Sequence, residues 1–187
     1  MTKNQIRKEA LEQRNSLSAT ESASLSQKLL EGFKTLKFSK IKVVHVFLPI
    51  AAKNEPNTYL FIEWLLQEHP EIEIIVPKAD FDNGLMSSYT YTGREDLTNS
   101  AYGIPEPKNA KLTTVKPDMV LIPLLAFDEK GYRVGYGKGF YDRFLQDLDT
   151  QKIGLSFFDA ITEINDVHLK DIRLDKCITP NGIVLFS

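Results

Sequence analysis

Apolar residues recur at helical spacing along the amino-terminal part of the chain. Ile6, Ala10 and Leu11 fall on one face of a predicted helix, and a stripe of basic residues follows a neighbouring face at Lys3, Arg7 and Arg14. The segment Ser18-Ala19-Thr20-Glu21 then has the form of a capping box, which predicts that a second helix begins there. The apolar stripe of this helix ends near residue 36, at the last of Leu25, Leu29, Phe33 and Leu36.

The rest of the chain alternates short apolar runs with helical patterns. Residues 43–48 are apolar, rich in valine and bounded by Pro49, which is typical of a strand buried on both faces of a parallel sheet. A helix over 57–69 and a strand over 71–77 ending at a proline follow. We expect further strands at 85–91, 119–127, 152–157 and 182–186, a short helix at 140–148 and a loop at 102–107. Pro123 predicts an irregularity in the central strand.

This alternation predicts one doubly wound α/β domain over residues 1–187, with no internal repeat and no linker long enough to divide it. In such folds ligands bind beyond the carboxyl ends of the strands, so the loops that follow strands are where chemistry is expected. Phe61, Trp64, Phe127 and Phe157 are expected in the core, whereas tyrosines near strand ends could stack on a planar ligand.

Composition narrows the class of protein. Hydrophobic residues make up 42% and charged residues 26% of the 187 residues, as in ordinary folded proteins. A net charge of -2 gives no overall electrostatic attraction to nucleic acid or to an anionic membrane, so any anion must be bound locally. Cys177 is the only cysteine, which excludes an internal disulfide and a multi-cysteine metal site. Without a secretory signal or an apolar span, the sequence predicts a cytoplasmic protein.

The most informative segment is glycine-rich and spans residues 131–143, Gly-Tyr-Arg-Val-Gly-Tyr-Gly-Lys-Gly-Phe-Tyr-Asp-Arg. It follows the most apolar strand and precedes a helix, so backbone amides and the helix start could surround a phosphate, with Lys138 as a mobile cation. The glycine spacing matches neither a Walker A loop nor a dinucleotide fingerprint. The alternative is a glycine-rich turn that binds no ligand.

Other candidate residues each have a structural explanation as well as a functional one. Asp142 is expected in the first turn of a helix, where a carboxylate is stabilised without a ligand, or it could hold Mg²⁺. Asp171 and Asp175, in the loop 169–175, either are solvated or reach the same face. Glu55 either precedes a helix or points into a cleft. Lys3 and Arg7 either form a solvated basic edge or clamp an anion.

Two remaining residues are assigned structural roles. His45 lies within an apolar strand and is expected to be a hydrogen-bonded core histidine, and the histidines have no neighbouring zinc ligands. Cys177 has no histidine neighbour and is expected to be a small buried side chain. Neither residue is predicted to take part in chemistry.

The segment 122–128, Ile-Pro-Leu-Leu-Ala-Phe-Asp, followed by the glycine-rich segment, closely resembles the 5-formyltetrahydrofolate cyclo-ligase family, also called 5,10-methenyltetrahydrofolate synthetases. The resemblance extends over the whole chain. Its other matching parts are Lys3 to Arg7, Glu55 to Thr58, 76–78, Met86, 102–107 and 171–179. The resemblance implies a three-layer α/β sandwich with a mostly parallel central sheet and helices on both faces, which agrees with the alternating pattern.

Family membership would give the candidate residues specific roles. The resemblance implies that Lys138 and Arg133 are catalytic and that Asp142 and Asp171 hold magnesium. It implies ATP contacts from Lys3, Arg7, Arg133, Val134, Gly135, Tyr136, Gly137, Lys138, Gly139, Phe140 and Tyr141. It implies folate contacts from Arg7, Glu55, Met86, Tyr102, Tyr136 and Phe140. Asp175 matches a recurrent position whose role stays open.

The implied reaction closes 5-formyltetrahydrofolate to 5,10-methenyltetrahydrofolate with ATP and Mg²⁺, releasing ADP and phosphate through a phosphorylated formyl intermediate. The expected partners are ATP and the folate, with or without a polyglutamate tail, and a monomer without nucleic acid or membrane contacts is favoured. Two departures concern the folate edge, namely Phe140 where tyrosine is frequent and the Pro105-Glu106-Pro107 stretch. The competing interpretations are an α/β protein that binds a sugar phosphate or coenzyme A, and a folate-binding or storage protein without turnover.

Overall fold

The computed structural model describes residues 1–186 as a single-domain α/β fold around an eight-stranded sheet. The strand order is β12-β11-β10-β7-β1-β2-β3-β6. The sheet strands are β1 (Val43–His45), β2 (Glu73–Ala79), β3 (Met86–Thr90), β6 (Leu112–Thr113), β7 (Met119–Pro123), β10 (Gln151–Leu155), β11 (Lys176–Thr179) and β12 (Gly182–Leu185). The five strands from β11 to β2 run parallel, and β12, β3 and β6 join the two edges in antiparallel pairs.

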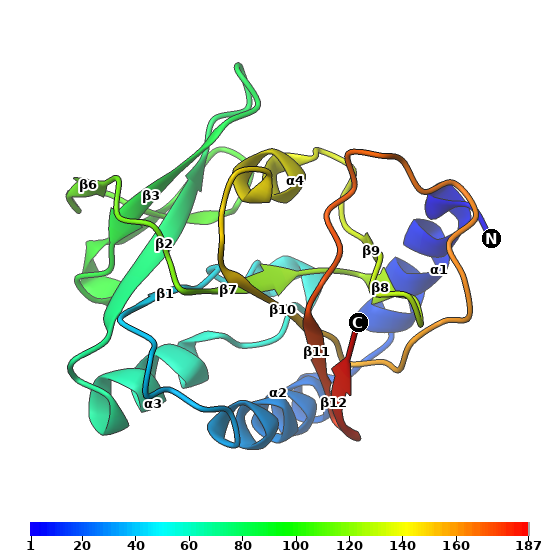
Figure 1. Cartoon of the computed structure of the whole chain (residues 1–187), viewed down its shortest axis with the longest axis horizontal. Helices are drawn as coiled ribbons and strands as arrows, with labels where there is room; N and C mark the ends of the chain where they lie inside the picture. Colours follow the sequence, from blue (N-terminus) through cyan, green and yellow to red (C-terminus); the bar gives the residue numbers. More distant parts are fainter. Residues whose placement is uncertain (187) are drawn as a thin grey trace.

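Helices cover both faces of this sheet, which confirms the predicted three layers. The helices are α1 (Lys3–Asn15), α2 (Ala19–Lys34), α3 (Tyr59–Glu68) and α4 (Phe140–Leu145), with short 3-10 turns η1 (Ala51–Lys53) and η2 (Arg94–Asp96). Figure 1 shows α2 and α3 along one face and α4 on the other. None of the helices in residues 1–186 has the length and apolar composition needed to cross a membrane.

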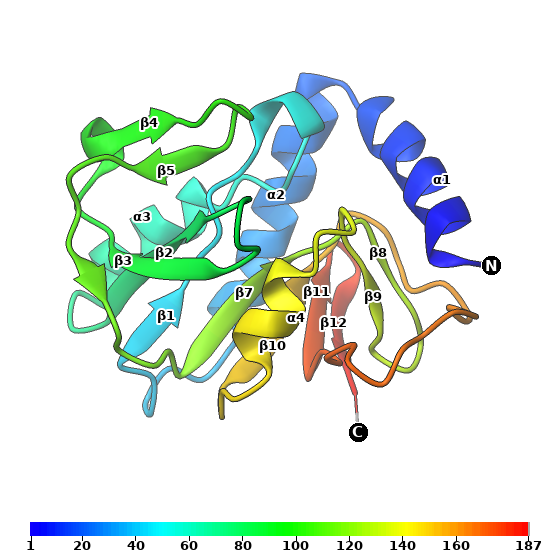
Figure 2. The same cartoon turned by 90° about the horizontal axis from the view of Figure 1, so that it is seen from above.

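The two amino-terminal helices begin as their sequences predict. Ser18 caps α2, and its backbone N–H donates a hydrogen bond to the Glu21 carboxylate at 2.8 Å, so the predicted capping box is confirmed. Thr2 and Gln5 form a second capping box at α1. Helix α1 lies apart from the α2 and α3 layer, beside a ribbon formed by β8 (Ala126–Phe127) and β9 (Arg133–Val134), as Figure 2 shows.

Several predicted strands have different limits in the structure. Strand β1 stops at His45. Strand β2 continues through Pro77, because Pro77 lies beyond the last pair that β2 forms with β1, His45 with Ile75, and its missing N–H is tolerated there. The central strand β7 ends at Pro123, and residues 126–127 pair with β9 instead, which confirms the expected irregularity. The expected loop at 102–107 was wrong in part, because β5 (Pro105–Pro107) pairs with β4 (Leu97–Asn99). Strand β11 was not predicted.

The predicted core aromatics are confirmed. Phe61, Phe127 and Phe157 are buried, and Trp64 packs against the cluster between the sheet and the α2 and α3 layer. Cys177 is fully buried, and burial raises the pKa of its thiol, in agreement with a structural role.

His45 is buried as predicted, but the expected hydrogen bond was wrong. Within residues 1–186 neither ring nitrogen has a hydrogen-bond partner, and the ring packs against Phe144 at 4.9 Å and Tyr141 at 6.0 Å between ring centroids. Burial away from water disfavours the charged imidazolium, so the pKa of His45 is lowered to about 3 from its ordinary value of 6.5.

This burial predicts acid sensitivity. The folded protein binds the His45 proton less tightly than the unfolded chain does, so stability is full above pH 6.5 and is lost as the pH falls from there toward about 3. The free energy of unfolding should drop by about 2 kcal/mol between about pH 7 and about pH 5 through this residue. Urea unfolding of the wild type and of His45→Leu at both pH values measures the drop, which should shrink in the variant. The control His168→Gln, at an exposed histidine, should show the same drop in the free energy of unfolding as the wild type. A drop in His45→Leu as large as that of the wild type would refute the assignment of the acid sensitivity to His45.

Candidate functional site

A cavity of about 930 Å³ opens at the carboxyl ends of the parallel strands. Phe47 and Leu48 follow β1, Pro77 and Ala79 end β2, and Pro123 ends β7, and all of them line the cavity. This is the edge at which the parallel fold predicts a ligand. The opposite wall comes from α1 and from residues 135–139 of the glycine-rich segment.

Every residue predicted for the site from the sequence lines this one cavity. They come from α1, the loop after β1, strand β3, the β4–β5 turn, the glycine-rich segment, α4 and the loop before β11. The residues are Lys3, Arg7, Glu55, Met86, Tyr102, Arg133, Val134, Gly135, Tyr136, Gly137, Lys138, Gly139, Phe140, Tyr141, Asp142 and Asp171. Their convergence is a structural observation, and the role of each residue stays a prediction.

The glycine-rich segment folds tightly against α1. Gly137 and Gly139 adopt positive φ angles of 84° and 67°, which other residues rarely adopt. A Cβ atom on Gly137 would lie 3.1 Å from Nη2 of Arg7, whose Nε donates to the Gly135 carbonyl at 2.9 Å. Helix α4 has only six residues, and the side chains of Arg7 and Lys138 bring full positive charges to the same cavity.

Arg143 was not predicted for the site and supports the same segment from α4. Its Nη2 donates to the Lys138 carbonyl at 2.7 Å, and its Nε donates to the Gly84 carbonyl at 2.7 Å. The side chain therefore joins the glycine-rich segment to the turn between β2 and β3. The sequence gives no signal for this contact, because the two segments are far apart along the chain.

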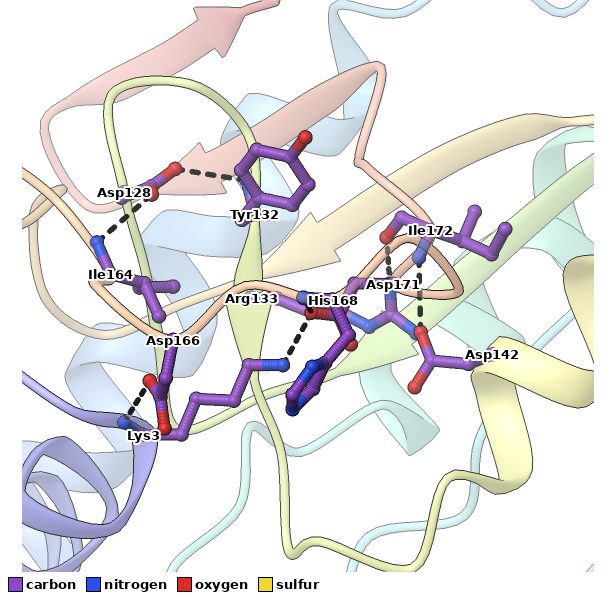
Figure 3. A network of polar contacts seen from close by, with 10 residues as sticks. All are labelled: Lys3, Asp128, Tyr132, Arg133, Asp142, Ile164, Asp166, His168, Asp171 and Ile172. Atoms are coloured by element: carbon purple, nitrogen blue, oxygen red, sulfur yellow. Dashed lines mark hydrogen bonds and ion pairs between the residues drawn. The ribbon is translucent and has the colours of Figure 1, made fainter.

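Two ion pairs line the wall between α1 and α4 (Figure 3). Arg133, with only 7% of its side chain exposed, donates from Nη2 to Oδ1 of Asp142 at 2.8 Å, and the Ile172 amide donates to the same oxygen at 3.1 Å. Lys3 Nζ donates to Oδ2 of Asp171. Burial raises the pKa of Asp171, but the hydrogen bond from the His168 amide and the Lys3 ammonium outweigh it and hold that pKa below its ordinary value.

The donor set of this wall fits Mg²⁺ bound together with a phosphate ligand. Within the described residues, Oδ2 of Asp142 and Oδ1 of Asp171 accept no hydrogen bond, so each carboxylate keeps an oxygen for a ligand. Magnesium in nucleotide sites is commonly held by one or two carboxylates plus phosphate oxygens and water. Residues 1–186 contain no cluster of three or more histidine, cysteine or acidic side chains that could hold a metal on their own.

Glu55 lies on the other side of the cavity and is only 6% exposed. Its carboxylate accepts a hydrogen bond from the Tyr136 hydroxyl at 2.6 Å and from the Ile50 amide at 2.7 Å. Burial raises the pKa of Glu55, and these two hydrogen bonds together with the charges of Arg14 and Lys53 oppose that rise. A buried carboxylate aimed at a cavity is suited to binding a neutral ligand that presents N–H donors.

Aromatic and apolar side chains form the wall beside β3. The Phe81 ring lies 4.3 Å from the Tyr102 ring and 5.1 Å from the Phe140 ring between centroids, and Met86 lines the cavity next to them. Phe140, at a position where tyrosine is frequent in the family that the sequence resembles, packs here through its ring. Phe81 and Lys53, whose ammonium lies 4.1 Å above the Tyr136 ring, were not predicted from the sequence.

An α/β fold with basic side chains, a glycine-rich segment and two carboxylates around one cavity at the strand ends defines a class of proteins that bind small anionic ligands. The model of the 5-formyltetrahydrofolate cyclo-ligase family matches residues 1–180, so the chain belongs to that family. It is accordingly an enzyme of the ligase class. The resemblance predicted from the sequence is confirmed.

Individual relatives support this membership. The 5-formyltetrahydrofolate cyclo-ligase of Mycoplasma pneumoniae is 35% identical over 162 residues, which cover 84% of this chain and 86% of that protein. The protein of the same name from Escherichia coli K12 is 30% identical over 146 residues, 75% of this chain and 79% of that one. The NMR structure of Aquifex aeolicus 5,10-methenyltetrahydrofolate synthetase has a TM-score of 0.82 and 32% identity, and the match covers 99% of this chain and 93% of that one.

Proposed function

We propose that this protein catalyses the ATP- and Mg²⁺-dependent closure of 5-formyltetrahydrofolate to 5,10-methenyltetrahydrofolate, with release of ADP and phosphate. The single observation that carries the proposal is the convergence of cations, two carboxylates, a buried glutamate and an aromatic wall on one cavity. The cations and the paired carboxylates lie toward α1 and α4, and Met86, Tyr102 and Phe81 lie toward β3. A polyanionic nucleotide and a flat heterocycle fit these two regions respectively.

In the half of the cavity toward α1 and α4, the residues that would bind the nucleotide are Lys3, Arg7, Lys138 and Arg133. Their side chains line the cavity beside the glycine-rich segment, and cations at this place stabilise negative charge on transferring phosphoryl oxygens. We place the phosphates of ATP along residues 133–141. When bound at Asp142 and Asp171, Mg²⁺ would neutralise phosphate charge and orient the γ-phosphoryl group.

The folate half uses Glu55 and the aromatic wall. We place the pterin ring against Glu55, whose buried carboxylate accepts the N–H donors of the ring, and the remainder of the folate along Met86, Tyr102 and Phe140. Tyr136 contacts both halves, because its hydroxyl binds Glu55 while its backbone belongs to the glycine-rich segment.

The proposed chemistry has two steps. A formyl oxygen is a poor leaving group, so it first attacks the γ-phosphorus of ATP, and the bond from phosphorus to the ADP oxygen breaks. The N10 lone pair then attacks the formyl carbon, the carbon–oxygen bond breaks to release phosphate, and N10 loses its proton. The second step is intramolecular, so holding the folate bent brings the two atoms together at high effective concentration. No protein nucleophile is required.

We further propose that residues 1–187 form one cyclo-ligase domain that acts as a monomer in the cytoplasm. A single buried thiol, Cys177, is typical of proteins in reducing compartments. The expected partners are small molecules alone, ATP and the folate, with or without a polyglutamate tail.

The proposal is tested by mixing the protein with 5-formyltetrahydrofolate, ATP and Mg²⁺ and following the near-ultraviolet absorbance of the methenyl product. Absorbance should rise only when both ATP and Mg²⁺ are present, with one ADP formed per methenyl product. Folate binding without any rise would favour a binding protein, and the absence of both would favour another phosphorylated ligand.

A further inference from the structure

Arg14, the last residue of the basic stripe predicted on α1, is buried behind the cavity wall. Only 3% of the residue is exposed, and it is not among the residues that line the cavity. It lies seven positions after Arg7, so the two residues share one side of α1 and lie about two turns apart. Arg14 is buried because α1 packs this side against the β8–β9 ribbon and η1.

The Arg14 guanidinium binds two groups at the site. Its Nη1 donates to the Leu124 carbonyl at 3.1 Å, in the break between β7 and β8, and its Nη2 donates to the Tyr136 hydroxyl. That hydroxyl in turn donates to Oε1 of Glu55 at 2.6 Å. The chain of contacts runs in one direction, because arginine only donates and the Glu55 carboxylate only accepts.

A second, independent contact connects the same helix end to the Glu55 loop. Asn54 adopts a positive φ of 46° and donates from Nδ2 to the backbone carbonyls of Arg14 and Leu17, both at 3.2 Å. Asn54 immediately precedes Glu55. The end of α1 thus holds the loop through its backbone and the Glu55 carboxylate through its side chain.

We infer that Arg14 is a positioning residue that acts through the Tyr136 hydroxyl to orient the Glu55 carboxylate for the folate. The inference rests on the proposed function, since it deepens the role of Glu55 there. Arg14 does not touch the substrate. It fixes the direction of the Tyr136 hydroxyl and adds a buried positive charge that favours the ionised form of Glu55, the form with two acceptor oxygens.

The charged and titratable groups around Glu55 set the expected pH dependence. Lys53 on η1 and Arg14 on α1 favour its ionised form, Tyr136 donates a hydrogen bond to it, and Tyr141 on α4 faces it as a neutral phenol. Loss of Arg14 leaves burial opposed by fewer groups, so the pKa of Glu55 should rise further. Folate binding should then weaken most at low pH, where more of the carboxyl group is protonated.

The test compares Arg14→Met, Tyr136→Phe and the double variant in steady-state assays across pH. Each single variant should raise the KM for the folate by about tenfold or more near neutral pH, with a larger rise at lower pH and an unchanged KM for ATP. Because Arg14 acts through the hydroxyl, the double variant should resemble the more affected single variant rather than multiply the two effects. The exposed Lys8→Met on the same helix is the matched control and should match the wild type.

Arg14→Lys provides the conservative rescue. Lysine keeps the charge but lacks the planar pair of donors. Arg14→Lys should therefore have the pH profile of the wild type, and its KM for the folate should lie between those of the wild type and Arg14→Met. An unchanged folate KM in Arg14→Met, or effects that multiply in the double variant, would overturn the inference. If Arg14→Met does not fold, Tyr136→Phe and Arg14→Lys decide between the outcomes. If both of these variants keep the wild-type KM for the folate, the proposed action of Arg14 through Tyr136 on Glu55 is refuted. A wild type that does not cyclise the folate overturns the proposed function instead.

Discussion

Lys138→Ala is expected to slow turnover at saturating ATP by about a hundredfold to a thousandfold, because it removes the cation to which we assign stabilisation of the transferring phosphoryl group. The Lys138 side chain is exposed, lines the cavity and makes no ion pair within residues 1–186, so its charge is available to a ligand. Its removal should not disturb the fold, because the contact from Arg143 uses the Lys138 backbone carbonyl.

Lys138→Ala should slow the phosphoryl-transfer step and leave folate binding unchanged. Equilibrium binding of 5-formyltetrahydrofolate should stay within about twofold of the wild-type value, since Glu55 and the aromatic wall are unchanged. Lys170→Ala, which removes an exposed lysine beside Asp171, is the matched control and should keep full turnover. Wild-type turnover in Lys138→Ala at saturating ATP would remove the residue from the mechanism.

Glu55→Ala is expected to weaken folate binding by about tenfold to a hundredfold, the range for the loss of hydrogen bonds to a charged group. The carboxylate is buried, so its partners Tyr136 and the Ile50 amide are left without an acceptor when it is removed. The Kd for ATP should change little, because the nucleotide side of the cavity is formed by other residues.

Two further variants separate binding from folding. Glu55→Gln keeps the size of the side chain and loses only the charge and one acceptor, so it should bind the folate better than Glu55→Ala. Glu68→Ala removes an exposed carboxylate on α3 and should bind the folate as the wild type does. Calorimetric titration with the folate measures all three, and an unaltered Kd in Glu55→Ala would exclude the pterin contact.

The sequence predicts those features of the fold and of the site that depend on short-range pattern. The glycine-rich segment, with its positive φ angles at Gly137 and Gly139, and the capped start of α2 at Ser18 follow from local residue types. The convergence of Lys3 and Asp171 was expected only through the family resemblance, because nothing local brings residues 168 positions apart together.

Features that depend on packing could not be predicted. A helical pattern shows that Arg14 lies on a given face of α1 but not that β8, β9 and η1 cover that face. Phe81 lies in the turn between β2 and β3, and Arg143 donates a hydrogen bond to the Gly84 carbonyl in the same turn. The sheet sets the position of this turn, so neither contact could be predicted. Strand β11 was missed because its short sequence of mixed polarity has no clear alternation.

The most direct measurement follows the formyl oxygen. Folate labelled with ¹⁸O in the formyl group is converted by the wild-type protein with unlabelled ATP and Mg²⁺, and the released phosphate is analysed by mass spectrometry. If the formyl oxygen attacks the γ-phosphorus, about one labelled oxygen should appear in each phosphate released per methenyl product. Unlabelled phosphate, with the label recovered in water, would contradict the phosphorylated intermediate and with it the central claim for this cavity.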